Sequence, residues 1–99
     1  MKKTIFLLMI ILSTSYSFSQ TAEDYFYKGV DKYKLEDYRG AIADYSKAIE
    51  LKPDYADVYF FRGIAKLLLN QKDSGCLDLS KAGELGYSQA YDSIREFCN

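Results

Sequence analysis

Apolar and small residues recur at intervals of three and four along two neighbouring stretches of the chain. These positions are Tyr25, Gly29 and Tyr33 and, after a break, Ala41, Tyr45 and Ala48. This period is typical of amphipathic helices. Thr21, followed three residues later by an acid, predicts the start of the first helix. Asp37 is expected to cap the second helix and Pro53 to end it, since proline has no N–H to donate.

The two-helix pattern returns when the chain is shifted against itself by 34 residues. Twelve of the 34 aligned positions are identical. The identical pairs are Ala22/Ala56, Tyr25/Tyr59, Phe26/Phe60, Gly29/Gly63, Lys32/Lys66, Leu35/Leu69, Asp44/Asp78, Ser46/Ser80, Lys47/Lys81, Ala48/Ala82, Glu50/Glu84 and Leu51/Leu85. A fixed period in this range is typical of solenoids. Each unit is therefore predicted to be a helix–turn–helix.

The small residues of both units resemble those of the tetratricopeptide repeat (TPR) family. The matching positions are Gly29, Ala41, Ala48 and Pro53 in the first unit and Gly63, Gly75 and Ala82 in the second. The resemblance implies an all-α, TPR-like α-solenoid with repeats over residues 22–55 and 56–87. The family's large apolar residue before each glycine is Lys28 or Arg62 here, and we expect the aliphatic stem to cover apolar surface.

A fifth and last helix is predicted over residues 88–98, with no sheet anywhere. Apolar residues recur there at helical spacing, Gly86 is placed to end the preceding helix, and Ser88 is placed to cap the new one. Residues 81–90 also resemble the related Sel1-like repeats. Because the apolar end of a repeat stack needs a cover, we predict that this helix is a C-terminal cap.

Residues 1–19 have the pattern of a secretory signal peptide. Two lysines precede an apolar run from Ile5 to Leu12, and Ser17-Phe18-Ser19 offers a small-x-small cleavage site. Cleavage before Gln20 would give an exported chain, periplasmic or extracellular, with a net charge of 11 − 14 = −3. A retained N-terminal membrane anchor is the alternative, although about 20 apolar residues are needed to span a bilayer.

Composition offers little for catalysis or nucleic-acid binding. The chain has no histidine, which excludes a histidine base or metal ligand, and 13 basic against 14 acidic residues leave no basic surplus for nucleic acid. The acid pairs Asp24–Asp31 and Asp37–Asp44 are interpreted as caps and solvated positions. We therefore predict a protein that is not an enzyme and has no catalytic residues, cofactor or metal.

Two cysteines, Cys76 and Cys98, lie at equal distances of 11 residues on either side of Tyr87. Antiparallel helices leaving a turn there would bring them level, each about 16 Å along its helix. Export to an oxidising compartment favours a disulfide between them. Two buried thiols acting as small apolar residues are the alternative. A metal site would lack further ligands, and no C-x-x-C redox motif is present.

The resemblance also implies a concave groove lined by the first helix of each repeat. The positions that match are Glu23, Phe26, Val30 and Tyr33, and then Asp57, Phe60, Ile64 and Leu67. Phe26 and Val30 stand where some family members hold a peptide carboxylate with Lys and Asn, so an apolar peptide or helix of another protein is the expected ligand. The alternative is a self-associating homodimer. No membrane contact is expected after signal cleavage.

Overall fold

The computed structural model describes residues 20–99, which form five helices and no strand. The helices are α2 (Ala22–Lys34), α3 (Tyr38–Leu51), α4 (Ala56–Leu68), α5 (Lys72–Glu84) and α6 (Gln89–Phe97). Within residues 20–99, the fold is all-α as predicted, and the five predicted helices are present. The predicted signal peptide, residues 1–19, lies outside the described residues. No helix in the described part is both long and apolar enough to cross a bilayer.

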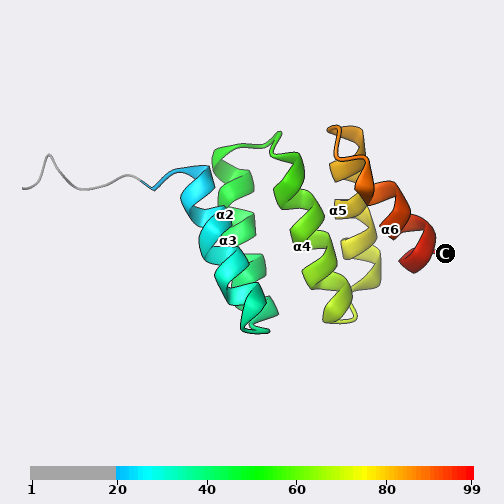
Figure 1. The fold of residues 1–99 in the computed structure, drawn as a ribbon, viewed down its shortest axis with the longest axis horizontal. Helices are drawn as coiled ribbons and strands as arrows, with labels where there is room; N and C mark the ends of the chain where they lie inside the picture. Colours follow the sequence, from blue (N-terminus) through cyan, green and yellow to red (C-terminus); the bar gives the residue numbers. More distant parts are fainter. Residues whose placement is uncertain (1–19) are drawn as a thin grey trace, which may run out of the picture.

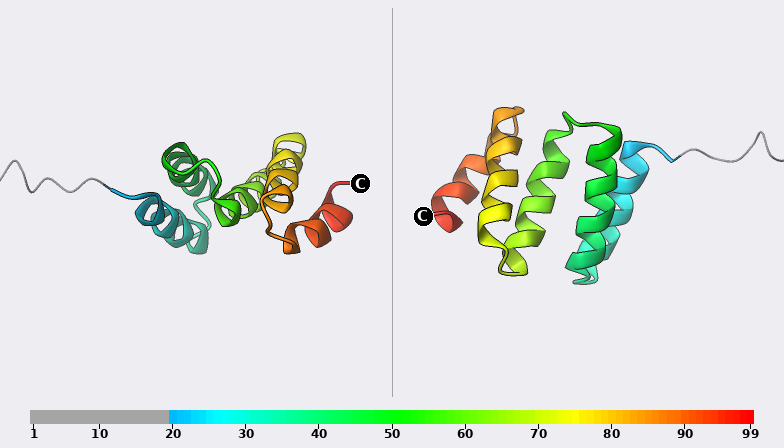
Figure 2. Two further views of the ribbon diagram at one scale, coloured as in Figure 1. Left: turned by 90° about the horizontal axis from the view of Figure 1, so that it is seen from above. Right: turned by 180° about the vertical axis from the view of Figure 1, so that it is seen from behind.

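Each helix packs mainly against the next one along the chain (Figure 1). We call α2–α3 the first hairpin and α4–α5 the second hairpin. Seen from above in Figure 2, the helices zigzag between two layers. α2, α4 and α6 form one layer, and α3 and α5 form the other. This arrangement is consistent with a TPR-like solenoid, and it places the first helix of each hairpin on the same side of the molecule.

Local capping explains where the first two helices begin. Asp24 N donates to Thr21 Oγ1 over 3.2 Å, and Thr21 N donates to the Asp24 carboxylate over 3.0 Å, which forms a capping box. Asp37 accepts from Gly40 N over 3.0 Å at the start of α3. The prediction for Ser88 is wrong, because its side chain makes no capping hydrogen bond. The backbone of Ser88 is itself helical, whereas a residue whose side chain caps a helix typically has an extended backbone.

The turns after α2, α4 and α5 are Schellman motifs, in which the chain reverses through one residue of positive φ. Those residues are Glu36 and Asn70, both with φ of 62°, and Gly86 with φ of 105°. In each turn the residue after it donates back to a carbonyl of the helix, as Tyr87 N does to Ala82 O over 2.9 Å. Gly86 ends α5 as the sequence predicts.

Close packing holds each hairpin together. Tyr45 is fully buried, and a Cβ placed on Gly29 would lie 2.5 Å from its ring. In the second hairpin a Cβ on Gly63 would lie 2.9 Å from the carbonyl oxygen of Gly75. The small alanines at matching positions, Ala41, Ala48 and Ala82, are fully buried. Small residues therefore stand where helices approach most closely.

Candidate functional site

All eight residues expected to line a groove lie on α2 and α4, in the same layer of the molecule (Figure 2). Their surroundings differ, however. Phe26 packs against the rings of Tyr45, Tyr55 and Phe61, with centroids 5.4 to 6.0 Å apart. Val30 and Tyr33 also pack against the core of the first hairpin. Phe26 and Tyr33 therefore join the two hairpins through Phe61, and all three side chains are only partly exposed to a ligand.

The remaining apolar members of the set lie further along the same layer. The Phe60 ring stacks on Tyr87, with centroids 4.6 Å apart. Ile64 and Leu67 line a pocket of about 150 Å³ whose other walls are Leu68 and Phe97. This pocket, called here the α4–α6 pocket, is lined by apolar side chains alone. It suits one apolar side chain of a ligand.

Sequence reasoning missed Leu68 and Phe97 as walls of this pocket. Both are about half exposed, at 49% and 47%, and both face the same pocket as Ile64 and Leu67. Helical spacing placed Leu68 and Phe97 on two helices, but it did not show that the end of α6 lies beside α4. The disulfide between α5 and α6 was the available signal, since Cys98 follows Phe97 directly.

Aromatic rings and carboxylates gather in the same layer near the first turn of α4. Burial raises the pKa of Tyr55, and the charges of Glu23 and Asp57 raise it further. Burial also raises the pKa of Tyr87, with Asp57 again adding to the shift. The Glu23 and Asp57 side chains are themselves exposed. This part of the layer is therefore aromatic and negatively charged.

One lysine of the chain already lies in these surroundings. Lys52 Nζ is 4.6 Å from the centroid of the Tyr55 ring and 3.9 Å from Glu23 Oε1. A cation above an aromatic face is attracted by the ring quadrupole, and the carboxylate adds to that attraction. The surface therefore already accommodates an ammonium group.

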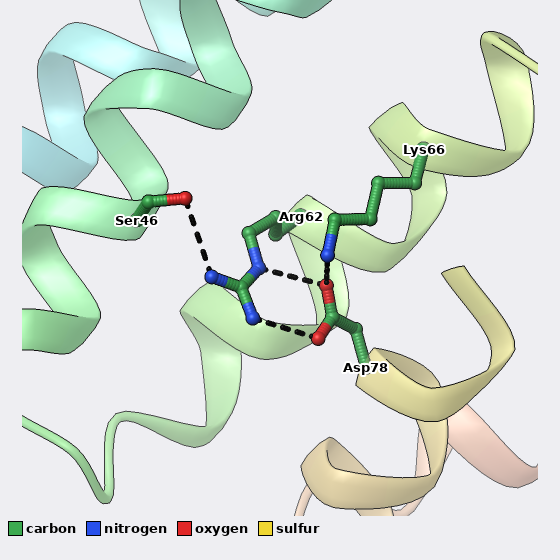
Figure 3. A network of polar contacts seen from close by, with 4 residues as sticks. All are labelled: Ser46, Arg62, Lys66 and Asp78. Carbon is green, nitrogen blue, oxygen red and sulfur yellow. Dashed lines mark hydrogen bonds and ion pairs between the residues drawn. The ribbon is translucent and has the colours of Figure 1, made fainter. Parts of the chain in front are cut away.

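A buried ionic cluster lies on the opposite side of α4, where that helix meets α3 and α5 (Figure 3). Arg62 donates from Nε and Nη2 to the two carboxylate oxygens of Asp78, over 2.7 and 2.8 Å. Lys66 Nζ lies 2.8 Å from Asp78 Oδ2, and Arg62 Nη1 is 3.2 Å from Ser46 Oγ. Asp78 is only 6% exposed. Arg62 thus does more than cover apolar surface with its stem, because its guanidinium links three helices.

Of the four acids considered as pairs from the sequence, Asp24, Asp37 and Asp44 have structural roles and Asp31 is exposed. Asp37 caps α3, and Asp44 Oδ2 lies 2.8 Å from Lys32 Nζ. This ion pair raises the pKa of Lys32, chiefly through its hydrogen bond to Asp44. Within residues 20–99, no group of three or more Cys, Asp or Glu is placed to hold a metal ion.

The two cysteines are joined in the structure. Cys76 in α5 and Cys98 after α6 have sulfurs 2.09 Å apart and Cα atoms 5.9 Å apart. This geometry is compatible with the disulfide that equal spacing from the turn predicts. The bond fixes the end of α6 against α5, and with it the neighbouring Phe97.

Comparison with known proteins identifies the repeat. Residues 29–70 match the TPR repeat family, which takes in the chain from Gly29 in α2 to the turn after α4. No curated protein matches the chain. TPR repeats generally mediate protein–protein interaction, and the family is typically non-catalytic. Residues 29–70 are therefore similar to a TPR repeat, and the five helices of residues 20–99, packed in consecutive pairs, are consistent with a TPR-like solenoid.

Proposed function

We propose that this protein is a non-catalytic adaptor or assembly factor that binds a segment of another protein on the layer formed by α2, α4 and α6. The observation that carries the proposal is the α4–α6 pocket, where four apolar side chains from two helices face one small space. An apolar anchor of a partner that enters such a pocket would supply much of the binding energy. Catalysis is not part of this proposal.

The test is capture of a partner by the chain from Gln20 to Asn99, compared between surface variants. Leu68→Ser combined with Phe97→Ser is expected to abolish capture, because both side chains are walls of the pocket. Leu77→Ser is the matched control, since Leu77 is 72% exposed on α5 in the other layer. Retention of the same partner by the double variant would contradict the proposal. Phe26→Ala and Phe60→Ala are poorer choices, because both rings pack within the fold.

A homodimer is the second candidate, and the open end of the stack favours it. Leu77 and Ile94 line an open depression of about 480 Å³ beside the disulfide, where a further helix of a longer repeat protein would pack. Light scattering after size-exclusion chromatography separates the two proposals. A dimer that persists on dilution and is lost on Leu77→Ser would support self-association.

Export is part of the same proposal. The disulfide supports it, since such bonds persist in oxidising compartments, either the periplasm or the outside of the cell. N-terminal sequencing of the protein made in its own cells is expected to begin at Gln20. A protein that keeps Met1 and fractionates with membranes would instead support the retained anchor.

A further inference from the structure

Helix α6 is the least supported helix of the stack. It lies at the end of the molecule and packs mainly against α5 (Figure 1). It has nine residues, whereas an isolated helix shorter than about 12–15 residues is marginal in water. Ala90 is its one fully buried side chain, and Ser88 gives it no side-chain cap. Its position therefore depends on the few contacts that it makes with α5.

These contacts are unevenly distributed along α6. Near its start, the Tyr91 ring packs so closely on Gly83 of α5 that a Cβ there would lie 2.7 Å from it. Residues 95–97, at its end, are all exposed. Apart from the disulfide, the second half has the partly buried Ile94 and an exposed hydrogen bond from Lys72 to the last residue. The disulfide is therefore the main support of this half.

The α4–α6 pocket depends on the same half of the helix. Ile64, Leu67 and Leu68 come from α4, and Phe97 is the one wall that α6 supplies. Without Phe97, the three remaining side chains would form an open apolar strip on a single helix. The bond that positions Phe97 is thus a condition for the pocket.

The disulfide is also within reach of a reagent in solution. Cys76 and Cys98 are both partly exposed, and both line the open depression of about 480 Å³ at the end of the stack. Thiol–disulfide exchange requires a thiolate to approach one of the two sulfurs directly. Because that approach is made through the depression, both hairpins can stay folded during the reaction.

We propose, on the basis of the proposed function, that the bond between Cys76 and Cys98 is a redox switch for the α4–α6 pocket. The reductant is a dithiol, which attacks one bridge sulfur as a thiolate and forms a mixed disulfide, while the other sulfur leaves as a thiolate and takes up a proton. The second thiol of the reductant then displaces the first cysteine. Two electrons and two protons pass to the bridge, and the reductant becomes a disulfide. The second half of α6 loosens, and Phe97 leaves the pocket.

NMR of the chain from Gln20 to Asn99 tests the loss of the pocket without any ligand. In the oxidised protein, the ring protons of Phe97 should show nuclear Overhauser effects to methyl groups of the α4 walls. Dithiothreitol should abolish these effects and speed hydrogen exchange in residues 94–98 by about tenfold or more, while exchange in α2, α3 and α4 changes by less than about twofold. Persistence of the Phe97 contacts in the reduced protein would overturn the inference.

The rate of reduction separates a switch from a purely structural bond. If the sulfurs react in the folded protein, the rate with dithiothreitol should change by less than about twofold between no urea and a concentration just below the unfolding transition. A rate that rises steeply with urea would overturn the inference, because exchange would then require global unfolding. Cys76→Ser with Cys98→Ser is the matched control, which should lack the Phe97 contacts from the start and show no response to dithiothreitol.

Partner capture distinguishes this inference from the proposed function. Reduction is expected to weaken capture by about fivefold or more, since the anchor of the partner loses its pocket. Undiminished capture by a reduced protein that has lost the Phe97 contacts would contradict the proposed function and leave the switch of the pocket intact. Capture that is lost on Leu68→Ser with Phe97→Ser but is unchanged by reduction, with the Phe97 contacts retained, would overturn the inference alone.

Discussion

The two hairpins fill the space between their helices in different ways. In the first hairpin, Gly29 makes room for the ring of Tyr45, which is fully buried. In the second, Leu79 takes the place of that tyrosine, and Gly63 and Gly75 bring the backbones of α4 and α5 together. The comparison shows that one repeat pattern accommodates either an aromatic ring or direct contact between two helix backbones.

The ion pairs of the two hairpins differ in how deeply they are buried. Lys32 and Asp44 form a single ion pair in the first hairpin, and the lysine side chain is 42% exposed. Lys66 and Asp78 occupy the equivalent positions in the second, where Arg62 joins them and all three side chains are largely buried. The same charge pair can therefore affect the free energy of unfolding differently in the two repeats, because burial removes the screening by water.

Tyr45→Ala is expected to give the largest loss of stability, about 3–5 kcal/mol, because it leaves a cavity at the centre of the first hairpin. Leu79→Ala at the equivalent position should cost about 2–4 kcal/mol, since less volume is removed. Urea unfolding followed by circular dichroism measures both. A larger loss for Leu79→Ala would contradict the expected order of the two cavities.

Tyr45→Phe is the control for that prediction. The Tyr45 hydroxyl is buried and has no hydrogen-bond partner within the described residues. Removing it should therefore leave the free energy of unfolding unchanged or raise it by up to about 1 kcal/mol.

Asp78→Ala is expected to destabilise the protein by about 3 kcal/mol, because Arg62 and Lys66 would lose their shared partner in a buried position. Asp44→Ala should cost about 1 kcal/mol or less, since Lys32 can turn into water. The same unfolding measurement compares them. Equal losses would contradict the distinction drawn between the two ion-pair sites.

Cys98→Ser is expected to cost about 3 kcal/mol, because the disulfide closes a loop over a separation of 22 residues. The loss should be local to the second hairpin and its cap. Hydrogen exchange should quicken in α6, whose buried side chain is Ala90 alone, and change little in α2 and α3. Uniform quickening throughout the chain would show instead that α6 supports the whole stack.

Glu36→Gly is expected to give the smallest effect, a gain of about 0.5–1 kcal/mol. Glu36 has φ of 62° in the turn of the first hairpin, a conformation that costs a side chain with a Cβ but not glycine. Asn70→Gly, with the same φ in the second hairpin, should gain less, since asparagine tolerates this region better. Thermal unfolding compares the two, and a loss for Glu36→Gly would refute the strain argument.

Much of the fold could be predicted because each signal was local or periodic. The caps at Thr21 and Asp37 depend on residues three positions apart, and Gly86 marks the end of its helix by itself. The repeat of 34 residues then predicts how the hairpins follow one another. Ser88 was the local exception. Whether a serine caps a helix depends on its backbone conformation, which the residue type alone does not determine.

The site was harder to predict because it depends on contacts between distant segments. The pattern assigned Phe26 and Tyr33 to a ligand surface, yet the next hairpin covers much of both rings through Phe61. The α4–α6 pocket requires the position of α6, which the helical period does not specify. Arg62 looked like a substitute for an apolar residue, since its partner Asp78 lies 16 residues away on another helix.

The link between Cys76 and Cys98 also determines how the molecule would respond to tension on its ends. Cys98 is the last residue but one, so a force applied at Asn99 passes through the sulfur bridge directly into α5 and leaves α6 unloaded. Non-covalent packing alone resists the pull at the other end, where α2 would peel away first. A fully stretched oxidised chain would therefore be shorter than its reduced form by about 70 Å, since 22 extended residues reach about 75 Å and the bridge itself spans 5.9 Å between Cα atoms.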